Sequence, residues 1–387
     1  MSEIQVLFNG INLVSAGTLA TGKSLVRALI GLETDYVLNV ILPAGYGYEE
    51  ILRGSHINTI FFERRKFNSF WRLWFDFVLL PRLVKDLNVA GVISLGNHAA
   101  AKLDVPKVVL FRNAYYVDPV EGIGLKEYLK KRLEILFFSQ TVSTASKIVV
   151  QGESMKKRLA AVWNIPDAKL SIVPNALSEK FAAAGGCQRQ EIIPKERLKK
   201  DKGFGKQLVL LYVSRYYPHK NHRLILELAR KFASKGDEIV ILTTMNESDN
   251  DVKSLLNERD KEGLNSVFIN LGEIEQEELS DWYLMADALF FPSKLESFGN
   301  PFIEAMNFGL PILAADKPYA HDVCGDAATY FDPTSVDDAY NKVSTLVDQS
   351  KSLKEKGFLR LKSFPNWDTV AKTYLQLIAD EISTQKR

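Results

Sequence analysis

Two carboxylates bracket a glycine-containing loop in the second half of the chain. Glu296 precedes Gly299 and Glu304 follows it, with seven residues between the two glutamates. Carboxylates at this separation can accept hydrogen bonds from sugar or ribose hydroxyls on either side of a phosphate group. On spacing alone a simpler explanation stands beside this one. In it, Glu304 complements a helix dipole and Glu296 is a solvated loop residue.

Two cations form a second candidate group. Arg215 and Lys220 lie in Arg215-Tyr-Tyr-Pro-His-Lys220, directly after an apolar run. Fixed cations stabilise the negative charge that grows on a diphosphate leaving group without having to reorganise. The alternative is a solvated basic loop.

Both groups are expected at the ends of strands. The apolar run 286–291 predicts a buried strand before Glu296, and Pro301 suits the first turn of the helix that follows. Unpaired N–H groups at that helix start would favour a phosphate. Similar runs predict strands at 4–8, 36–42, 59–62, 89–95, 107–111, 207–214, 238–244, 267–271 and 312–315. Strands that alternate with helical segments favour parallel α/β sheets, which bind ligands at the carboxyl ends of their strands.

A third pattern offers a competing function. Residues 17–24, Gly-Thr-Leu-Ala-Thr-Gly-Lys-Ser, match the phosphate-binding loop of P-loop nucleotidases, which would use Lys23 and Ser24. Such a loop should follow its strand directly, but the first strand is expected to end by Gly10. A P-loop nucleotide-hydrolysing enzyme therefore stays as an alternative, as does a non-catalytic nucleotide-sugar-binding protein.

Composition indicates an ordinary soluble protein. The 387 residues are 46% hydrophobic and 25% charged, and two cysteines exclude a disulfide framework and favour a reducing compartment. The amino terminus lacks the basic start of a signal peptide, and no uncharged run is long enough to span a bilayer. We therefore expect a cytoplasmic protein.

The charge is unevenly distributed along the chain. Residues 1–175 hold 21 Lys and Arg against 15 Asp and Glu, a net +6, and the remainder is −4. The basic, aromatic segment 63–87 and the basic helix expected at 125–138 could contact an anionic membrane surface. The alternative for both segments is simple packing of their apolar faces against the sheet.

The segment 296–311, Glu-Ser-Phe-Gly-Asn-Pro-Phe-Ile-Glu-Ala-Met-Asn-Phe-Gly-Leu-Pro, resembles the nucleotide-sugar signature of retaining glycosyltransferases of family 4. Arg215 and Lys220 resemble the Arg and Lys of the same family. The resemblance implies the GT-B fold, an α/β architecture of two Rossmann-like βαβ domains facing across a cleft. It implies an acceptor-binding domain at 1–176, a linker at 177–206, a nucleotide-sugar-binding domain at 207–365 and a helix at 366–387 that crosses back to the first domain.

The resemblance also implies a function: transfer of a sugar from a UDP- or GDP-sugar to an acceptor hydroxyl, with retention at the anomeric carbon. The acceptor would be a glycan or lipid-linked glycan of bacterial lipopolysaccharide or capsule, reached at the inner face of the plasma membrane. The implied residues are Glu296, Arg215, Lys220 and His98 for catalysis, and Glu304, Ser297, Phe298, Gly299, Asn300, Gly272, Ile274 and Gly17 for the donor. Arg112 and Asn113 follow the strand expected at 107–111, a position that suits contacts with the acceptor, although the ordinary polarity of a loop explains them equally well. No cofactor, metal ion or nucleic acid is expected.

Overall fold

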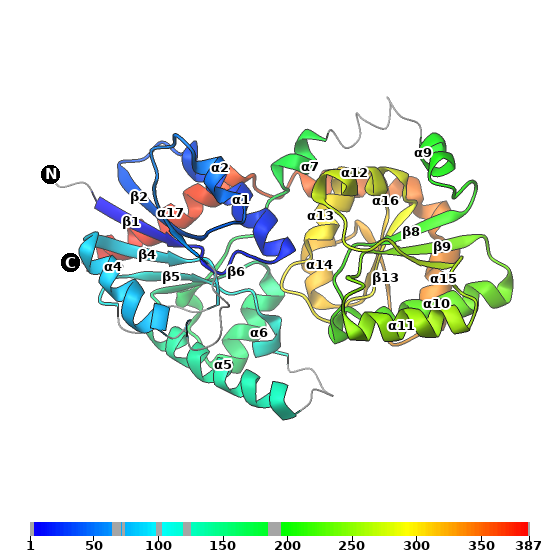
Figure 1. Ribbon diagram of the computed structural model, residues 1–387, viewed down its shortest axis with the longest axis horizontal. Helices are drawn as coiled ribbons and strands as arrows, with labels where there is room; N and C mark the ends of the chain where they lie inside the picture. The colour runs from blue at the N-terminus through cyan, green and yellow to red at the C-terminus, as the bar shows by residue number, and fades with distance from the viewer. Residues whose placement is uncertain are drawn as a thin grey trace. The chain divides into compact units, whose positions relative to one another are not determined.

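The computed structural model describes residues 4–63, 71, 74–97, 103–118, 125–184 and 195–385. The chain divides into two compact units, which we describe one at a time (Figure 1). Unit 1 is Met1–Ser178 together with Pro365–Arg387, and unit 2 is Glu179–Phe364.

Unit 1 is built on a seven-stranded parallel sheet in the order β3-β2-β1-β4-β5-β6-β7. The strands are β1 (Ile4–Asn9), β2 (Tyr36–Pro43), β3 (Asn58–Phe62), β4 (Val89–Ser94), β5 (Lys107–Leu110), β6 (Lys147–Val150) and β7 (Leu170–Ile172). Its central strands are almost wholly buried, as their continuous apolar sequences require when helices cover both faces.

Helices connect these strands. They are α1 (Ala16–Ile30), α2 (Tyr48–Leu52), the π-helix η1 (Phe75–Leu79), α4 (Leu80–Asp86), η2 (Ala114–Tyr116), α5 (Leu125–Thr144), α6 (Glu153–Trp163), η3 (Asp167–Lys169) and the returning α17 (Trp367–Gln385). Helix α17 lies beside α1 in Figure 1 and covers β4. A Cβ atom on Gly91 of β4 would lie 2.6 Å from Ile378, so glycine permits this close approach. The prediction that the last helix returns to the first domain is confirmed.

The P-loop interpretation is wrong, because residues 17–24 lie inside helix α1. The backbone N–H of Ser15 donates to Thr18 Oγ1 at 3.1 Å, which caps the helix directly before the pattern. Gly22 is a packing residue, since a Cβ atom there would overlap the Tyr48 hydroxyl and the Leu13 side chain. From Leu19 onward the backbone N–H groups of this segment donate within the helix, and Lys23 and Ser24 lie beyond its first turn, so they cannot line a loop that cradles phosphates.

Part of the aromatic segment 63–87 packs into the core of unit 1. Trp71 stacks on Phe75 with ring centroids 5.3 Å apart, and Phe62 meets Phe75 edge-on. Trp74 points outward and is 48% exposed. Residues 64–70 and 72–73, which carry most of the basic side chains of this segment, lie outside the described residues. No helix in the described part of the chain is long and apolar enough to cross a membrane.

Unit 2 is built on a six-stranded parallel sheet in the order β10-β9-β8-β11-β12-β13. The strands are β8 (Leu208–Tyr212), β9 (Ile239–Thr243), β10 (Phe268–Asn270), β11 (Ala288–Phe291), β12 (Ile312–Ala315) and β13 (Ala328–Phe331). The helices are α7 (Glu179–Ala183), α9 (Lys195–Asp201), η4 (Pro218–Lys220), α10 (His222–Lys235), α11 (Asn250–Lys261), α12 (Gln276–Met285), α13 (Asn300–Asn307), α14 (Pro318–Cys324), α15 (Val336–Ser344) and α16 (Leu346–Leu361). The strand order reverses direction between β8 and β11, which makes this the switch point of the sheet.

Where the structure describes the range 177–206, which was expected to form a linker, it shows the helices α7 and α9 of unit 2. Phe181 of α7 packs edge-on against Tyr283 and Phe308. Lys195 and Lys199 of α9 both pair with Asp287, at 2.7 and 2.9 Å. These contacts fasten both helices to the body of unit 2.

Candidate functional site

Two loops meet at the switch point of unit 2, one after β8 and one after β11. Asn221 joins them: its side-chain amide donates to the carbonyls of Pro292, at 3.2 Å, and Pro333, at 2.8 Å. Its φ of +60° is left-handed, a conformation that asparagine tolerates better than most residues. The backbone N–H of Lys294 also donates to the His219 carbonyl at 2.7 Å. The two loops are therefore fixed to each other.

Lys220 and Glu296 form an ion pair at this junction. Lys220 Nζ donates to Glu296 Oε1, and the two side chains are only 17% and 13% exposed. The buried hydroxyl of Tyr212 donates to the Lys220 carbonyl at 2.8 Å, which fixes the backbone that carries the lysine. Lys220 and Glu296, which belonged to separate groups in the sequence analysis, thus form one largely buried ion pair.

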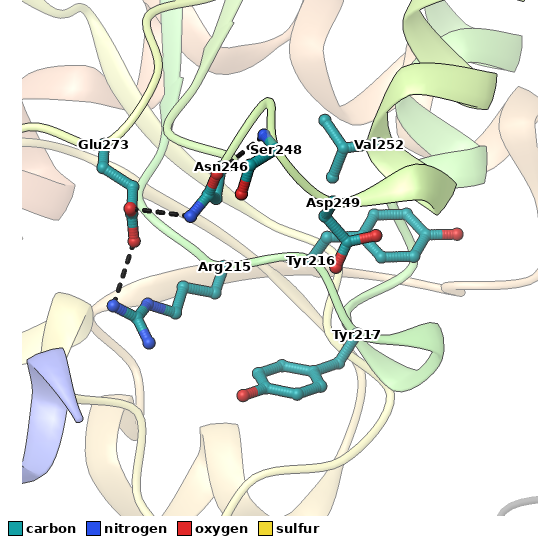
Figure 2. A pocket seen from close by; sticks show the side chains of 8 residues that line it. All are labelled: Arg215, Tyr216, Tyr217, Asn246, Ser248, Asp249, Val252 and Glu273. Atoms are coloured by element: carbon teal, nitrogen blue, oxygen red, sulfur yellow. Dashed lines mark hydrogen bonds and ion pairs between the residues drawn. The ribbon is translucent and has the colours of Figure 1, made fainter. Parts of the chain in front are cut away.

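Arg215, from the start of the same loop, has a different partner. Its Nη2 lies 2.9 Å from Glu273 Oε1, and Asn246 Nδ2 donates to Glu273 Oε2 at 2.8 Å (Figure 2). Arg215 and Glu273 are about half exposed. Together with the side chains around them they line a pocket of about 230 Å³, formed by Arg215, Tyr216, Tyr217, Asn246, Ser248, Asp249, Val252 and Glu273.

The pocket continues toward the loop that follows β10. Gly272, with a φ of +76°, and Ile274 flank Glu273 in this loop. The structure thus places the two predicted loop residues beside the partner of Arg215. Glu273 itself was not among the predicted site residues, and no sequence signal indicated its ion pair with Arg215.

Helix α13 (Asn300–Asn307) begins beside Glu296 with an open amino end. Its N-cap is Gly299, no side chain caps it, and its first turn holds no acidic residue. Gly299 has a φ of +91°, and a Cβ atom there would lie 2.9 Å from Phe302. The first N–H groups of a helix lack intrahelical partners, so this end attracts an anion. Ser297 is half-buried, whereas Phe298 is 3% exposed and belongs to the core.

Glu304 lies one turn further along α13. The hydroxyl of Tyr283, on α12, donates to Glu304 Oε2 at 2.7 Å. Burial raises the pKa of Glu304 to about 7, and the Tyr283 hydrogen bond opposes the rise. The simpler explanation made Glu296 a solvated loop residue, which its 13% exposure and its pairing with Lys220 contradict. Glu304 is itself largely enclosed, so its role is not limited to complementing the helix dipole. Tyr283 was missed because it lies on a helix that the sequence presents as ordinary core.

The predicted residues of unit 1 follow β4 and β5 or lie in α1. Asn97 Oδ1 accepts hydrogen bonds from the backbone N–H groups of Arg112, at 2.6 Å, and Asn113, at 3.1 Å. Gly17 is in the first turn of α1 and is exposed. His98 lies outside the described residues.

Comparison with known proteins identifies a matching family model. Residues 194–357 match the model described as glycosyl transferases group 1. The chain is 25% identical over 213 residues to O-antigen chain mannosyltransferase B of Escherichia coli, a match that covers 54% of this chain and 52% of that protein. It is 24% identical over 223 residues to O-antigen chain mannosyltransferase RfbU of Salmonella typhimurium, covering 57% and 54%. The matches span about half the length of these curated relatives.

Solved structures resemble nearly the whole chain. Sucrose-phosphate synthase from Thermosynechococcus elongatus superposes with a TM-score of 0.74 at 14% identity, covering 98% of this chain and all of that one. Anabaena HepE, solved with UDP and glucose, gives 0.72 at 15% identity, covering 97% and 100%. WaaG, described as a glycosyltransferase involved in lipopolysaccharide biosynthesis, gives 0.70 at 14% identity, covering 96% and 98%. The fold is GT-B, as predicted, and the family model together with this fold supports a glycosyltransferase.

Proposed function

We propose that the protein is a retaining glycosyltransferase of family 4 that moves a sugar from a UDP- or GDP-sugar to an acceptor hydroxyl. The enclosed Lys220–Glu296 pair, at the switch point of unit 2 and beside the open amino end of α13, is the observation that carries this proposal. The names of the curated relatives support an acceptor among bacterial surface polysaccharides.

In this proposal Arg215 and Lys220 hold the donor diphosphate. In the free protein each cation is paired with a carboxylate, Glu273 or Glu296, so the four side chains carry no net charge. A diphosphate would take the place of both carboxylates around the cations, and the first N–H groups of α13 would add hydrogen bonds. The cations would do the work that a metal ion does in metal-dependent transferases.

The carboxylate of Glu296, once the diphosphate has displaced it from Lys220, has a second role. Released from Lys220, it would accept hydrogen bonds from hydroxyls of the transferred sugar, while Glu304 would accept them from the ribose. The bond between the anomeric carbon and the phosphate oxygen breaks, and the bond from that carbon to the acceptor oxygen forms on the same face. The acceptor proton passes to the departing diphosphate oxygen, whose charge the two cations stabilise.

We assign donor binding to unit 2 and acceptor binding to unit 1, where Arg112 and Asn113 follow β5. His98 would contact the transferred sugar from unit 1, which makes closure of the two units a step of the reaction. In this proposal the exposed Trp74 contacts the lipid of a lipid-linked acceptor, and the protein makes peripheral contact with anionic lipid.

Calorimetric titration of UDP and of GDP, without added metal, tests the donor site. We expect one nucleotide to bind the wild type and binding to be lost in Lys220→Ala. Lys235→Ala is the matched control, because Lys235 is exposed at the opposite end of α10. Equal affinities in both variants would refute the proposed role of Lys220.

Turnover separates an enzyme from a non-catalytic binding protein. Release of nucleoside diphosphate from UDP-glucose or GDP-mannose would be followed with fragments of surface polysaccharide as acceptors. Proton NMR of the product then gives the anomeric configuration. Inversion would contradict the retaining mechanism while leaving the donor site intact.

A further inference from the structure

Arg112 is a half-buried cation that has no counter-charge among the described residues. It follows β5, and its Nε is buried and has no hydrogen-bond partner among the described residues. Its Nη1 reaches Thr21 Oγ1 at 3.5 Å, the limit of a hydrogen bond. Thr21 already donates its hydroxyl proton to carbonyls one turn back in α1, at 3.1 Å each, so it can only accept. No acidic side chain in the described part of the chain pairs with this guanidinium.

Neutral groups surround Arg112. Burial lowers its pKa, and the side chains that act on it electrostatically are Tyr48 and Tyr374. Both tyrosines are buried, burial raises the pKa of each, and both are therefore uncharged at neutral pH. The Tyr48 hydroxyl donates to the Leu13 carbonyl at 3.0 Å. Helices α1, α2 and α17 thus supply low-polarity walls but no anion.

Such an arrangement is energetically costly. Arginine stays protonated in proteins, and partial removal of an ion from water without a partner disfavours the folded state. The backbone beside Arg112 is nevertheless fixed, because Asn97 Oδ1 accepts from two successive N–H groups. The Nε–H of the guanidinium is unfilled and its Nη1 makes only one long contact, with Thr21, so the group has donors to offer an anion.

We propose that Arg112 binds an anionic group, a phosphate or a carboxylate, carried by the acceptor. That the anionic group belongs to the acceptor rests on the proposed function, in which unit 1 binds the acceptor. That Arg112 binds an anion rests only on the missing counter-charge among the described residues. A planar guanidinium takes either group through two parallel hydrogen bonds. The two sources are an acceptor that bears a sugar or lipid phosphate and one that bears a uronic acid.

Thermal unfolding in the Lys220→Ala background tests the site, since that change removes the proposed diphosphate site of unit 2. The probes are inorganic phosphate and glucuronate. We expect at least one to raise Tm by about 2–4 °C at saturating concentration, and Arg112→Met to lose the rise. Without anion, Arg112→Met should melt at or above the parent temperature, because it removes an unpaired charge from a half-buried position. Protection by phosphate alone indicates a phosphorylated acceptor, and protection by glucuronate alone indicates a uronic acid.

Arg112→Lys keeps the charge and should retain part of the protection. The Nε–H signal of Arg112 in arginine-labelled protein, assigned by its absence in Arg112→Met, should shift as the anion is added. Equal protection of parent and Arg112→Met, or no protection of the parent, overturns the inference. The inference is also overturned if both Arg112 variants have a lower Tm than the parent and no anion changes the Tm, because Arg112 would then have a purely structural role. If wild type binds neither UDP nor GDP but keeps the Arg112-dependent protection, the proposed function fails and the anion site stands.

Discussion

Glu304 offers a sharp test of the proposed donor site, because its burial links stability to pH. Its pKa is raised from 4.5 to about 7 in the folded protein. The unfolded chain therefore binds fewer protons than the folded chain between these values, and stability falls as pH rises through this window. Glu304→Gln removes this titration, and its amide oxygen can still accept from Tyr283.

The expected magnitude follows from the shift. A difference of about 2.5 pKa units corresponds to about 3 kcal/mol at pH values above 7. This is an upper value, since part of Glu304 is accessible to solvent. Near pH 5, where the unfolded chain has already released most of this proton, the variant should be more stable by about 1 kcal/mol or less. At pH 8 it should be more stable by up to about 3 kcal/mol.

Urea unfolding at pH 5 and pH 8 measures the effect. The matched control is Glu238→Gln, in the same unit and exposed. Affinity for UDP-glucose and GDP-mannose provides the second readout, because these diesters do not titrate near neutral pH. If the carboxylate binds the ribose, wild-type affinity for the preferred donor should be about tenfold lower at pH 6 than at pH 8. Glu304→Gln should bind weakly and show a flat profile.

A stability difference between wild type and Glu304→Gln that stays constant from pH 5 to pH 8 would refute the raised pKa. A pH-independent affinity that equals that of the variant would refute the ribose contact, even if the stability result holds.

Three further predictions concern the same site. Gly299→Ala should destabilise unit 2 by about 1–3 kcal/mol in urea unfolding, because alanine disfavours a φ of +91° and its Cβ atom would overlap Phe302. An unchanged unfolding midpoint would contradict this prediction. Asn221→Ala should lower the free energy of unfolding by about 2–3 kcal/mol, because the carbonyls of Pro292 and Pro333 lose their hydrogen-bond donor. It should also weaken nucleotide binding at least fivefold, which calorimetry with UDP and GDP measures. Unchanged affinity would show that the hydrogen bonds of Asn221 do not support the nucleotide site. Sugar transfer should continue undiminished in EDTA, and a loss that Mg²⁺ restores would contradict the proposed role of the cations.

The part of the candidate site that lies in unit 2 follows from sequence to a large extent. Long apolar runs mark the strands of unit 2, and the polar residues at their carboxyl ends must share one edge of a parallel sheet. That reasoning brought Arg215, Lys220, Glu296 and Glu304 to the same edge. It could not predict the ion pair between Lys220 and Glu296, because their rotamers and the paths of their loops depend on the hydrogen bond from the Asn221 side chain to the Pro292 carbonyl.

The errors in unit 1 have a physical cause as well. The pattern at 17–24 reads as a loop because glycines usually interrupt helices. Here the cap formed by Ser15 and Thr18 starts α1 ahead of the pattern, and Gly22 makes room for Tyr48. Local propensity was overridden by packing between helices, which involves residues far apart in the sequence.

The return of α17 to unit 1 has a consequence for the order in which the protein forms on the ribosome. Unit 2 is encoded by an uninterrupted stretch, so it can fold as soon as that stretch emerges. The earlier part of unit 1 must wait, with the apolar face around Gly91 uncovered, until Ile378 and Ile382 have been synthesised. The amino-terminal half of the sequence is therefore the last to complete its structure, and in the interval it is the part that would need a chaperone.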